Sequence, residues 1–333
     1  MRHWDRRGAM AWLLWPAGAA FGAVAAVRRV LYRLGVRTPQ RAGVPVVVVG
    51  NLTAGGTGKT PLVLAIVEAL REAGWHPGIV SRGYVPERRV SRDEPPRQAT
   101  LVSDPALVGD EPILLARRSG CPVWVCADRA AACRALRAAD PACDVIVTDD
   151  GLQHYALARD LEICVVDPRG FGNGFLLPAG PLREPLSRLR TVDAVVRHGE
   201  GPLPPAPGVR TFDLRLAGET FVNLVDASNR RPAASFAGSR VHAVAGIGDP
   251  GRFFRQLAAF GIEVLPHAFP DHHAFRAGDL AFGDRLPVVM TEKDAVKCKG
   301  FLEARHWVFP VVAVLDPAFK SWLLERLGGP KAA

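Results

Sequence analysis

The chain has 333 residues, enough for two domains of ordinary size, and its composition of 48% apolar and 23% charged residues is typical of a folded protein. A formal net charge of +9 favours an anionic partner: nucleic acid, an acidic membrane surface or a phosphorylated substrate. Because the basic residues are scattered and no basic stripe is interleaved with aromatic residues, we do not expect nucleic acid as the partner. The 6 cysteines include no C-x-x-C pair, which predicts free thiols in a reducing compartment and argues against a zinc site.

The N-terminal segment is unusually apolar. Residues 8–27 carry no charge, and pairs of arginines stand on both sides, at positions 6–7 and 28–29. The run is just long enough to span a bilayer, but Pro16 interrupts it and alanine and glycine dilute it. We therefore predict a helix that lies in or dips into the membrane interface. The two alternatives are a helix that is buried against the protein's own core and a helix that spans the bilayer. The expected interfacial anchors are the tryptophans Trp4, Trp12 and Trp15.

After this segment, short apolar runs alternate with helical patterns. Several of the runs are continuously apolar, as in parallel strands that are covered on both faces, and the clearest helix between them covers residues 60–73. This β-α-β series predicts an α/β protein with a doubly wound, mostly parallel sheet, which binds its ligands beyond the carboxyl ends of the strands. The predicted strands are 44–49, 78–80, 123–126, 144–148, 162–166 and 194–197.

A proline-rich stretch at residues 200–208 marks a change of composition and indicates a linker or a domain edge. Beyond it, the pattern predicts a second, smaller α/β domain and a last helix at residues 317–327, which is free to pack back on the first domain. We expect a membrane-associated helix in 1–36, a phosphate-loop (P-loop) domain in 37–199 and the second domain in 200–333. The strands predicted for the second domain are 241–245, 262–265, 287–290 and 307–314.

The stretch NLTAGGTGKTPL at residues 51–62 lies between an apolar strand and a helix, which is the setting of a phosphate-binding loop. It ends in Gly-Lys-Thr, but Thr53 stands where the strict pattern G-x-x-x-x-G-K-[ST] has glycine. In such a loop the backbone N–H groups wrap the phosphates, Lys59 reaches the β- and γ-phosphates, and the Thr60 hydroxyl holds Mg²⁺. The residues predicted to bind ATP here are Thr53, Ala54, Gly55, Gly56, Thr57, Gly58, Lys59 and Thr60.

Carboxylates occur at the starts or ends of two other predicted elements. Asp149 and Asp150 follow an apolar strand and are suited to hold Mg²⁺, directly or through water. Asp110 and Glu111 open a helical pattern, where carboxylates serve as helix caps about as often as they serve chemistry. If the protein is a kinase, one of these two orients an acceptor hydroxyl and takes its proton. The predicted metal set is Thr60, Glu111, Asp149 and Asp150.

Three further motifs are weak when each is taken alone. The pattern SRGY follows the strand at 78–80, and PLREP places Arg183 where it is suited to pair with an anionic substrate group. The pattern FPDHH at residues 269–273 sets a carboxylate beside two imidazoles, which suits a histidine tuned by an acid better than a metal site. The pattern TEKD resembles the base-reading N-K-x-D motif with threonine for asparagine, so Lys293 is expected to help hold the nucleotide.

Taken together, the motifs resemble the tetraacyldisaccharide 4'-kinase family of lipid A synthesis. VVVVGNLTAGGTGKTP, SRGY, GDEP, DDGLQH, GPLREP, AGIGDPGRFF, FPDHH and MTEKDAVK stand in the family's order, over about residues 10–315. The resemblance implies transfer of the ATP γ-phosphate, with Mg²⁺, to the 4'-hydroxyl of an acylated glucosamine disaccharide 1-phosphate, giving lipid IVA. It also implies an enzyme on the cytoplasmic face of the inner membrane, with a cleft between two α/β domains that closes over the nucleotide.

The same resemblance implies roles for individual residues. Asp110 resembles the family's catalytic base and His272 its partner, while Lys59 resembles the phosphate-binding lysine. Glu111, Asp149 and Asp150 look like the acidic cluster near the metal. The residues expected to line the substrate site are Ser81, Arg82, Tyr84, Gln153, Arg183 and Glu184.

Two other functions fit the phosphate loop alone. A membrane-associated P-loop ATPase switch often carries a second lysine before the two glycines, but Ala54 stands at that position. A soluble P-loop ligase of small-molecule metabolism has no use for the apolar segment at 8–27. The kinase is therefore the favoured reading, because it accounts for the loop, the carboxylates and the apolar segment together.

Overall fold

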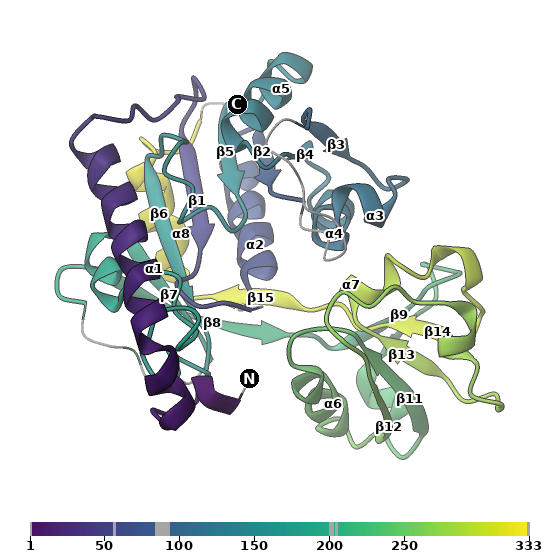
Figure 1. The fold of residues 1–333 in the computed structure, drawn as a ribbon. Coiled ribbons are helices and arrows are strands. Elements are labelled where there is room, and N and C mark those ends of the chain that lie inside the picture. Colours follow the sequence, from purple (N-terminus) through teal and green to yellow (C-terminus); the bar gives the residue numbers. More distant parts are fainter. Residues whose placement is uncertain (1, 56–57, 84–93, 200–202, 204–205, 332–333) are drawn as a thin grey trace.

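The computed structural model describes residues 2–55, 58–83, 94–199, 203 and 206–331. Their strands form one nine-stranded sheet and one six-stranded sheet, which lie in separate parts of the molecule (Figure 1). The α1 helix (Ala9–Arg33) runs along one side of the larger part, and the long strands β8 and β15 extend from the larger part toward the smaller one.

The larger sheet has the strand order β15-β8-β7-β6-β1-β5-β2-β4-β3. Pairing is antiparallel only at its two ends, between β3 and β4 and between β8 and β15; the other pairs are parallel. This arrangement confirms the prediction of a doubly wound, mostly parallel sheet. Its strands are β1 (Val46–Gly50), β2 (Pro77–Ser81), β3 (Arg97–Ala99), β4 (Val123–Val125), β5 (Val145–Thr148), β6 (Leu161–Val166), β7 (Ala194–His198), β8 (Arg210–Ala217) and β15 (Val312–Leu315).

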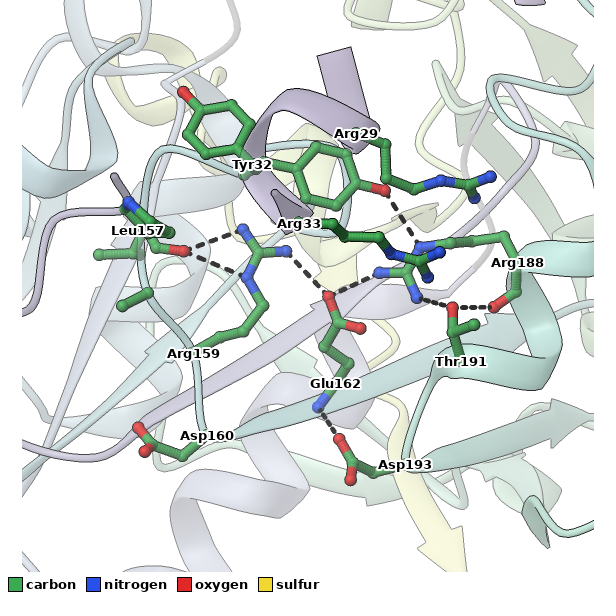
Figure 2. A pocket seen from close by; sticks show the side chains of 13 residues that line it. Arg29, Tyr32, Arg33, Leu157, Arg159, Asp160, Glu162, Arg188, Thr191 and Asp193 are labelled. Atoms are coloured by element: carbon green, nitrogen blue, oxygen red, sulfur yellow. Dashed lines mark hydrogen bonds and ion pairs between the residues drawn. The ribbon is translucent and has the colours of Figure 1, made fainter. Parts of the chain in front are cut away.

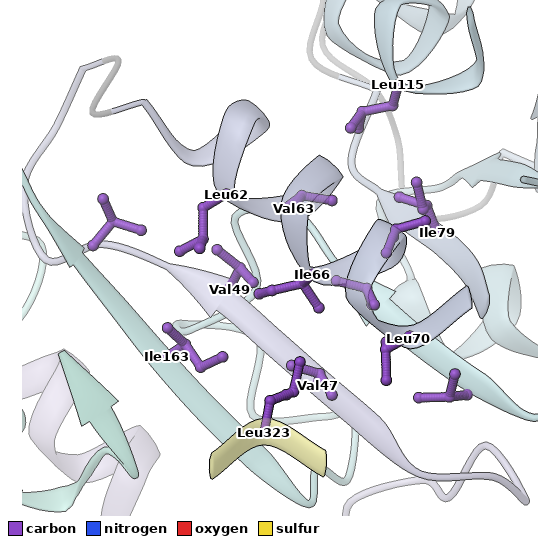
Figure 3. Packing of buried hydrophobic residues seen from close by; sticks show 14 of the residues in the cluster. Val47, Val49, Leu62, Val63, Ile66, Leu70, Ile79, Leu115, Ile163 and Leu323 are labelled. Carbon is purple, nitrogen blue, oxygen red and sulfur yellow. The ribbon is translucent and has the colours of Figure 1, made fainter. Parts of the chain in front are cut away.

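Helices cover both faces of this sheet. On one face the α2 side chains Leu62, Ile66 and Leu70, spaced by four residues, pack over β1 and β6 (Figure 3), and each buried aliphatic chain stabilises the fold by about 1.5–3 kcal/mol. Leu323 of the last helix joins the same cluster, so that helix packs on the larger sheet. The α-helices of the larger part that follow α1 are α2 (Lys59–Glu72), α3 (Pro105–Val108), α4 (Asp110–Ser119), α5 (Arg129–Ala139) and α8 (Pro317–Arg326).

The smaller sheet has the order β10-β9-β14-β13-β11-β12, with antiparallel pairing at β9 and parallel pairing elsewhere. Its strands are β9 (Thr220–Asn223), β10 (Arg230–Pro232), β11 (Arg240–Ala245), β12 (Glu263–Ala268), β13 (Val288–Met290) and β14 (His306–Val308), with helices α6 (Pro250–Ala258) and α7 (Glu292–Ala295). The 3-10 helices are η1 (Arg2–Trp4), η2 (Leu186–Thr191), η3 (Ala233–Phe236), η4 (Ala277–Leu280) and η5 (Lys299–Phe301).

The single strand predicted at 307–314 is wrong. Two strands replace it: β14 pairs in the smaller sheet, and β15 returns to pair with β8 in the larger one. Pro310 lies between them, and because proline has no N–H to donate to a ladder, it favours a break at this point. The strands β8 and β15 both follow residue 200 and yet pair in the larger sheet. The stretch 200–208 lies largely outside the described residues, and the division into 1–36, 37–199 and 200–333 stays a prediction.

The helix α1 has 25 residues and includes Pro16. Its contact with the rest of the protein is narrow: a Cβ at Gly18 would lie 2.9 Å from the Leu176 carbonyl oxygen, and the Trp12 ring meets Phe175 edge-on at 5.0 Å. Only 11% of its most apolar window is buried, so the alternative of a helix buried on the protein's own core is wrong. By length and composition, α1 is apolar enough to cross a membrane.

Candidate active site

A cavity of about 850 Å³ opens at the carboxyl ends of β1, β2 and β5, where a doubly wound sheet binds its ligands. Segments that follow strands of both sheets contribute to its wall: His272 comes after β12 of the smaller sheet, and it lines the same cavity as Lys59. Eleven of the residues singled out in the sequence line it: Gly55, Lys59, Ser81, Arg82, Glu111, Asp149, Asp150, Gln153, Arg183, Glu184 and His272.

The phosphate loop follows β1 and leads into α2 through Gly58, whose φ of 77° is in the left-handed region that favours glycine. Thr53 needs no such freedom: it is buried, forms an isolated bridge with Leu182, and has a negative φ. The side-chain amide of Asn51 donates to the Thr53 carbonyl oxygen at 2.8 Å and to its hydroxyl at 3.3 Å. The missing glycine is therefore replaced by an extended residue fixed by its neighbours. Gly56 and Thr57 lie outside the described residues.

Lys59 lies at the start of α2, with its Nζ 3.4 Å from Oδ1 of Asp150 and 3.4 Å from Oδ1 of Asn51. Arg183 donates from Nη1 to both oxygens of Asp150 at 2.9 Å. Burial alone would raise the pKa of Asp150, but the charges of Lys59 and Arg183 outweigh burial and hold that pKa below its usual value. Lys59, predicted to bind phosphate, and Arg183, predicted to bind substrate, thus share one ionised carboxylate.

Asp149 is 2% exposed, and its Oδ1 has no hydrogen-bond partner among the described residues. Burial, followed by the neighbouring charge of Glu111, raises the pKa of Asp149 to about 7. No group of three acidic, histidine or cysteine side chains within the described ranges is arranged to hold a metal ion. Because Mg²⁺ is usually held by one or two carboxylates with phosphate and water oxygens, the unpartnered oxygen of Asp149 fits such an ion. Thr60 lies in the first turn of α2, directly after Lys59, and is not among the residues that line this cavity.

Asp110 and His272 form a close pair. Asp110 begins α4 and is 4% exposed, and Nδ1 of His272 lies 3.1 and 3.0 Å from its two oxygens. His272 has a φ of 61°, a conformation uncommon for a residue other than glycine. Burial alone would raise the pKa of Asp110, but the hydrogen bond from His272 and the charge of Lys293 outweigh it and lower that pKa. The carboxylate is therefore ionised at neutral pH, and the imidazole lies between it and the cavity.

Lys293, expected to help hold the nucleotide, lies beside this pair. Its Nζ is 3.1 Å from Oε1 of Glu111, 3.1 Å from Oδ1 of Asp271 and 3.3 Å from Nε2 of His272. Burial alone would lower the pKa of Lys293, but the surrounding carboxylates, Glu111 first, raise that pKa above its usual value. Lys293 therefore joins α7 to the start of α4 as a charged bridge between the two parts of the molecule.

The residues expected at the substrate site are not all free to meet a ligand. Glu184 is buried and accepts hydrogen bonds from Nε2 of Gln153 at 3.2 Å and from the Tyr155 hydroxyl. Gln153 also donates to the Asn51 carbonyl oxygen at 3.0 Å, which ties this wall to the phosphate loop. Ser81 is buried at the end of β2 and Arg82 is exposed next to it. Tyr84 lies outside the described residues.

Sequence reasoning missed several residues that line the cavity. Arg129 is buried, donates from Nη2 to the Asp150 carbonyl oxygen at 3.0 Å, and has its pKa lowered to about 10 by burial. Arg129 comes just after β4, at the carboxyl edge of the sheet, and this position in the sequence could have marked it as a candidate site residue. Nothing in the sequence places α1 at this site, yet four of its residues line the cavity: Phe21, Val24, Ala25 and Arg28.

The chain is similar to known proteins over nearly its whole length. The family model described as "Tetraacyldisaccharide-1-P 4'-kinase" matches residues 10–328. A tetraacyldisaccharide 4'-kinase of Azoarcus sp. is 54% identical over 99% of this chain and 96% of its own length. One from Xanthomonas euvesicatoria is 51% identical over 92% of this chain and 89% of its own length. The crystal structure of the "apo" form of LpxK from Aquifex aeolicus in complex with ATP has a TM-score of 0.78 and 28% identity, covering 95% of this chain and 99% of that one.

Proposed function

Because the chain belongs to the tetraacyldisaccharide-1-P 4'-kinase family, we propose that it transfers the γ-phosphoryl group of ATP to the 4'-hydroxyl of a tetraacylated disaccharide 1-phosphate in lipid A synthesis. The observation that carries this proposal is the position of the Asp110–His272 pair. His272 lines the same cavity as Gly55 and Lys59 of the phosphate loop, which supports a site where an acceptor hydroxyl and a γ-phosphate would meet.

The phosphate loop would hold the donor. Lys59, which pairs with Asp150 in the structure, would bind the β- and γ-phosphate oxygens, and the N–H groups at the start of α2 would donate to phosphate oxygens as well. Thr60, Asp149, Asp150 and Glu111 are the residues that would hold Mg²⁺, which neutralises charge on the transferring phosphoryl group. The unpartnered oxygen of Asp149 is the structural support for this assignment.

The Asp110–His272 pair would serve as the base. As the acceptor oxygen bonds to the γ-phosphorus and the bond from phosphorus to ADP breaks, the hydroxyl proton passes to the pair. His272 is the member that lines the cavity, while Asp110 lies behind it with a lowered pKa and stabilises positive charge on the imidazole. Lys293 then keeps Glu111, Asp271 and the imidazole in one arrangement.

The helix α1 would place the enzyme on the membrane that holds its lipid substrate. The family and the exposed apolar helix are consistent with membrane association, and we assign the protein to the cytoplasmic face of the inner membrane, where ATP is present. Because Phe21, Val24 and Ala25 of the same helix line the cavity, acyl chains entering from the bilayer meet an apolar wall next to the phosphate loop.

The experiment is a transfer assay with γ-labelled ATP, Mg²⁺ and the purified disaccharide 1-phosphate in neutral detergent. The proposal expects a labelled lipid that carries a second phosphate at the 4'-position, and no such product from Asp110→Asn. Release of labelled inorganic phosphate without a labelled lipid would instead support an ATPase switch. Labelling of a small soluble acid would support the ligase alternative.

A further inference from the structure

A second cavity, of about 440 Å³, lies between the carboxyl-terminal part of α1 and the larger sheet (Figure 2). It is distinct from the active-site cavity, although the two share Tyr155 in their walls. Neighbouring residues of α1 face different cavities: Arg28 lines the active site, and Arg29 lines the second cavity. The charged residues that line the second cavity are Arg29, Arg33, Arg159, Asp160, Glu162, Arg188 and Asp193.

On the sheet side of this cavity the charged groups already have polar partners. Glu162 accepts from Nη1 of Arg159 at 2.9 Å and from Nη2 of Arg188 at 2.6 Å, and dashed lines in Figure 2 show both contacts. Asp160 accepts from the Val46 backbone N–H at 2.7 Å. Asp193 pairs with Arg326 at 2.5 Å, outside the cavity. Each carboxylate of this wall therefore already accepts a hydrogen bond or forms an ion pair within the protein.

On the helix side the charges are not neutralised. In the described part of the chain no carboxylate lies within 4.0 Å of the guanidinium of Arg29 or Arg33, and no dashed line in Figure 2 reaches either. Nε of Arg29 is enclosed by the protein without an acceptor, and it is not the group that meets a ligand. The guanidinium groups of Arg29 and Arg33 give this wall a positive charge that no carboxylate of the described residues balances, so the wall is suited to an anion that is supplied from outside the protein.

We propose that this cavity binds the phosphate of a bilayer phospholipid headgroup, held by Arg29 and Arg33. Two guanidinium groups match the oxygens of a phosphate. The occupant is argued from the helix itself, since Val27 and Val30, in the same part of α1 as the two arginines, are exposed and apolar. A helix that buries these side chains in acyl chains carries Arg29 and Arg33 at headgroup level.

The charge of the chain agrees with a lipid phosphate. Between Asp5 and Glu68 there is no acidic residue, while seven arginines and one lysine occur in the same stretch. An unopposed positive segment next to an apolar helix is attracted to anionic lipid surfaces. The proposed site differs from this general attraction, because two named arginines, Arg29 and Arg33, would hold the phosphate in one cavity.

The test compares two double variants that remove equal charge from the same region. Arg29→Gln/Arg33→Gln removes the cavity arginines, and Arg37→Gln/Arg41→Gln removes two exposed arginines that do not line it. Binding is measured by sedimentation of the full-length protein with phosphatidylcholine vesicles containing about one part in five phosphatidylglycerol. The measurements use about 0.5 M salt, where the screening length is only a few ångström and diffuse attraction is weak.

The proposal expects the dissociation constant to rise about tenfold or more for the cavity pair and less than about threefold for the control pair, because only the first loses charge-assisted hydrogen bonds. Equal losses in the two pairs would overturn it. The same variants are assayed for transfer in neutral detergent without phospholipid. A selective rise in KM for the lipid substrate there would also overturn it, since the cavity would then hold the substrate's own phosphate.

Folding is checked separately. The thermal midpoint and the affinity for ATP should equal those of the unchanged protein in both double variants. If the cavity pair is unstable, Arg33→Gln alone replaces it, because Arg33 is exposed at the last residue of α1 and its loss leaves the helix intact. The charge-conserving Arg29→Lys/Arg33→Lys should restore part of the vesicle binding, because lysine keeps the charge but not the planar pair of donors; no restoration in a normally folded variant would count against a site that holds the phosphate by charge.

Discussion

The imidazole Nδ1 of His272 lies 3.0 Å from Oδ2 of Asp110, although the two residues are 162 positions apart in the chain. Asp110 begins a helix against the larger sheet, and His272 follows the edge strand of the smaller sheet. The pair therefore exists only when the two parts of the molecule are brought together. Any reaction that uses it depends on their relative position.

We expect Asp110→Asn and His272→Ala each to lower kcat for the lipid substrate by about 10²-fold or more, since each removes part of the proton acceptor. The double variant should be little worse than either single one, because the two side chains act as a unit. Steady-state transfer assays measure all three. The adjacent His273, which bonds to Asp279 at 3.1 Å, provides the control: His273→Gln should keep most of the activity. Near-normal turnover in Asp110→Asn would refute the assignment of the base.

Lys59→Ala should lower kcat by about 10²-fold or more, because the charge that stabilises the transferring phosphoryl group is lost. The same assay at saturating ATP separates this effect from weaker nucleotide binding. A matched control is Lys320→Ala on α8, whose lysine is exposed and pairs with Glu72 on the helix surface. If both variants lose activity equally, the effect is not specific to the phosphate loop.

The ion pair between Arg118 of α4 and Glu292 of α7 should stabilise the contact between the two parts of the molecule. Nη1 of Arg118 lies 2.6 and 2.7 Å from the two carboxylate oxygens, and both side chains are mostly buried. A double-mutant cycle with Arg118→Met and Glu292→Gln should give a coupling of about 1–3 kcal/mol in the free energy of unfolding.

The exposed pair between Arg240 and Glu263 serves as the comparison, at 2.8 Å but with both side chains more than half exposed. Its coupling should be below about 1 kcal/mol, since water screens an exposed pair. Chemical denaturation measures both cycles. Equal coupling in the two cycles would show that the α4–α7 contact adds nothing beyond an ordinary surface pair.

His154 should make the protein sensitive to acid. Burial, followed by the charges of Arg129 and Arg159, lowers the pKa of His154 to about 3, against about 6.5 in the unfolded chain. Between these values the unfolded chain binds the extra proton and the folded protein does not, so stability falls as pH drops through this window, by about 1.4 kcal/mol per pH unit. His154→Gln lacks this contribution. Its unfolding free energy should therefore fall less steeply below pH 6.5, and parallel profiles would contradict the buried neutral histidine.

The exposed apolar face of α1 should determine membrane binding. Leu13 and Val27 are 72% and 59% exposed, and each contributes about 1.5–3 kcal/mol when it enters an apolar phase. Leu13→Gln/Val27→Gln should weaken partitioning to neutral vesicles by about 10²-fold. The exposed residues Leu101 and Val102 lie away from α1, so Leu101→Gln/Val102→Gln should leave partitioning unchanged. Vesicle flotation distinguishes the two, and equal partitioning would refute a membrane-binding role for this face.

The local sequence was sufficient to predict those site residues that lie within a few positions of one another or directly after a strand. The glycines and Lys59 follow an apolar strand and open a helix, and Asp149 and Asp150 follow another such strand. Because parallel strands end at one edge of the sheet, the sequence alone predicted that these groups meet, and Lys59 is 3.4 Å from Asp150. The apolar strands themselves were recognised for the same reason, since residues covered on both faces are continuously apolar.

Short amphipathic strands were harder to predict. The strand β8 alternates exposed and buried residues, and β10 is exposed throughout, so neither shows a continuous apolar run. Pairing with a distant partner, as β8 does with β15, stabilises such a strand, and local propensity carries no signal of that partner. The same limit explains the wrong single strand at 307–314.

The phosphate loop, the acidic strand ends and the apolar helix are recognisable in the sequence, because each is a local pattern of three to twenty-five residues. Tertiary packing, in contrast, brings Asp110 to His272 and places Lys293 beside the imidazole. It also decided that one side of α1 lines the active site while Arg29 and Arg33 line a second cavity. These contacts join residues far apart in the chain, and they form only when the packing of both sheets and α1 fixes where each segment lies.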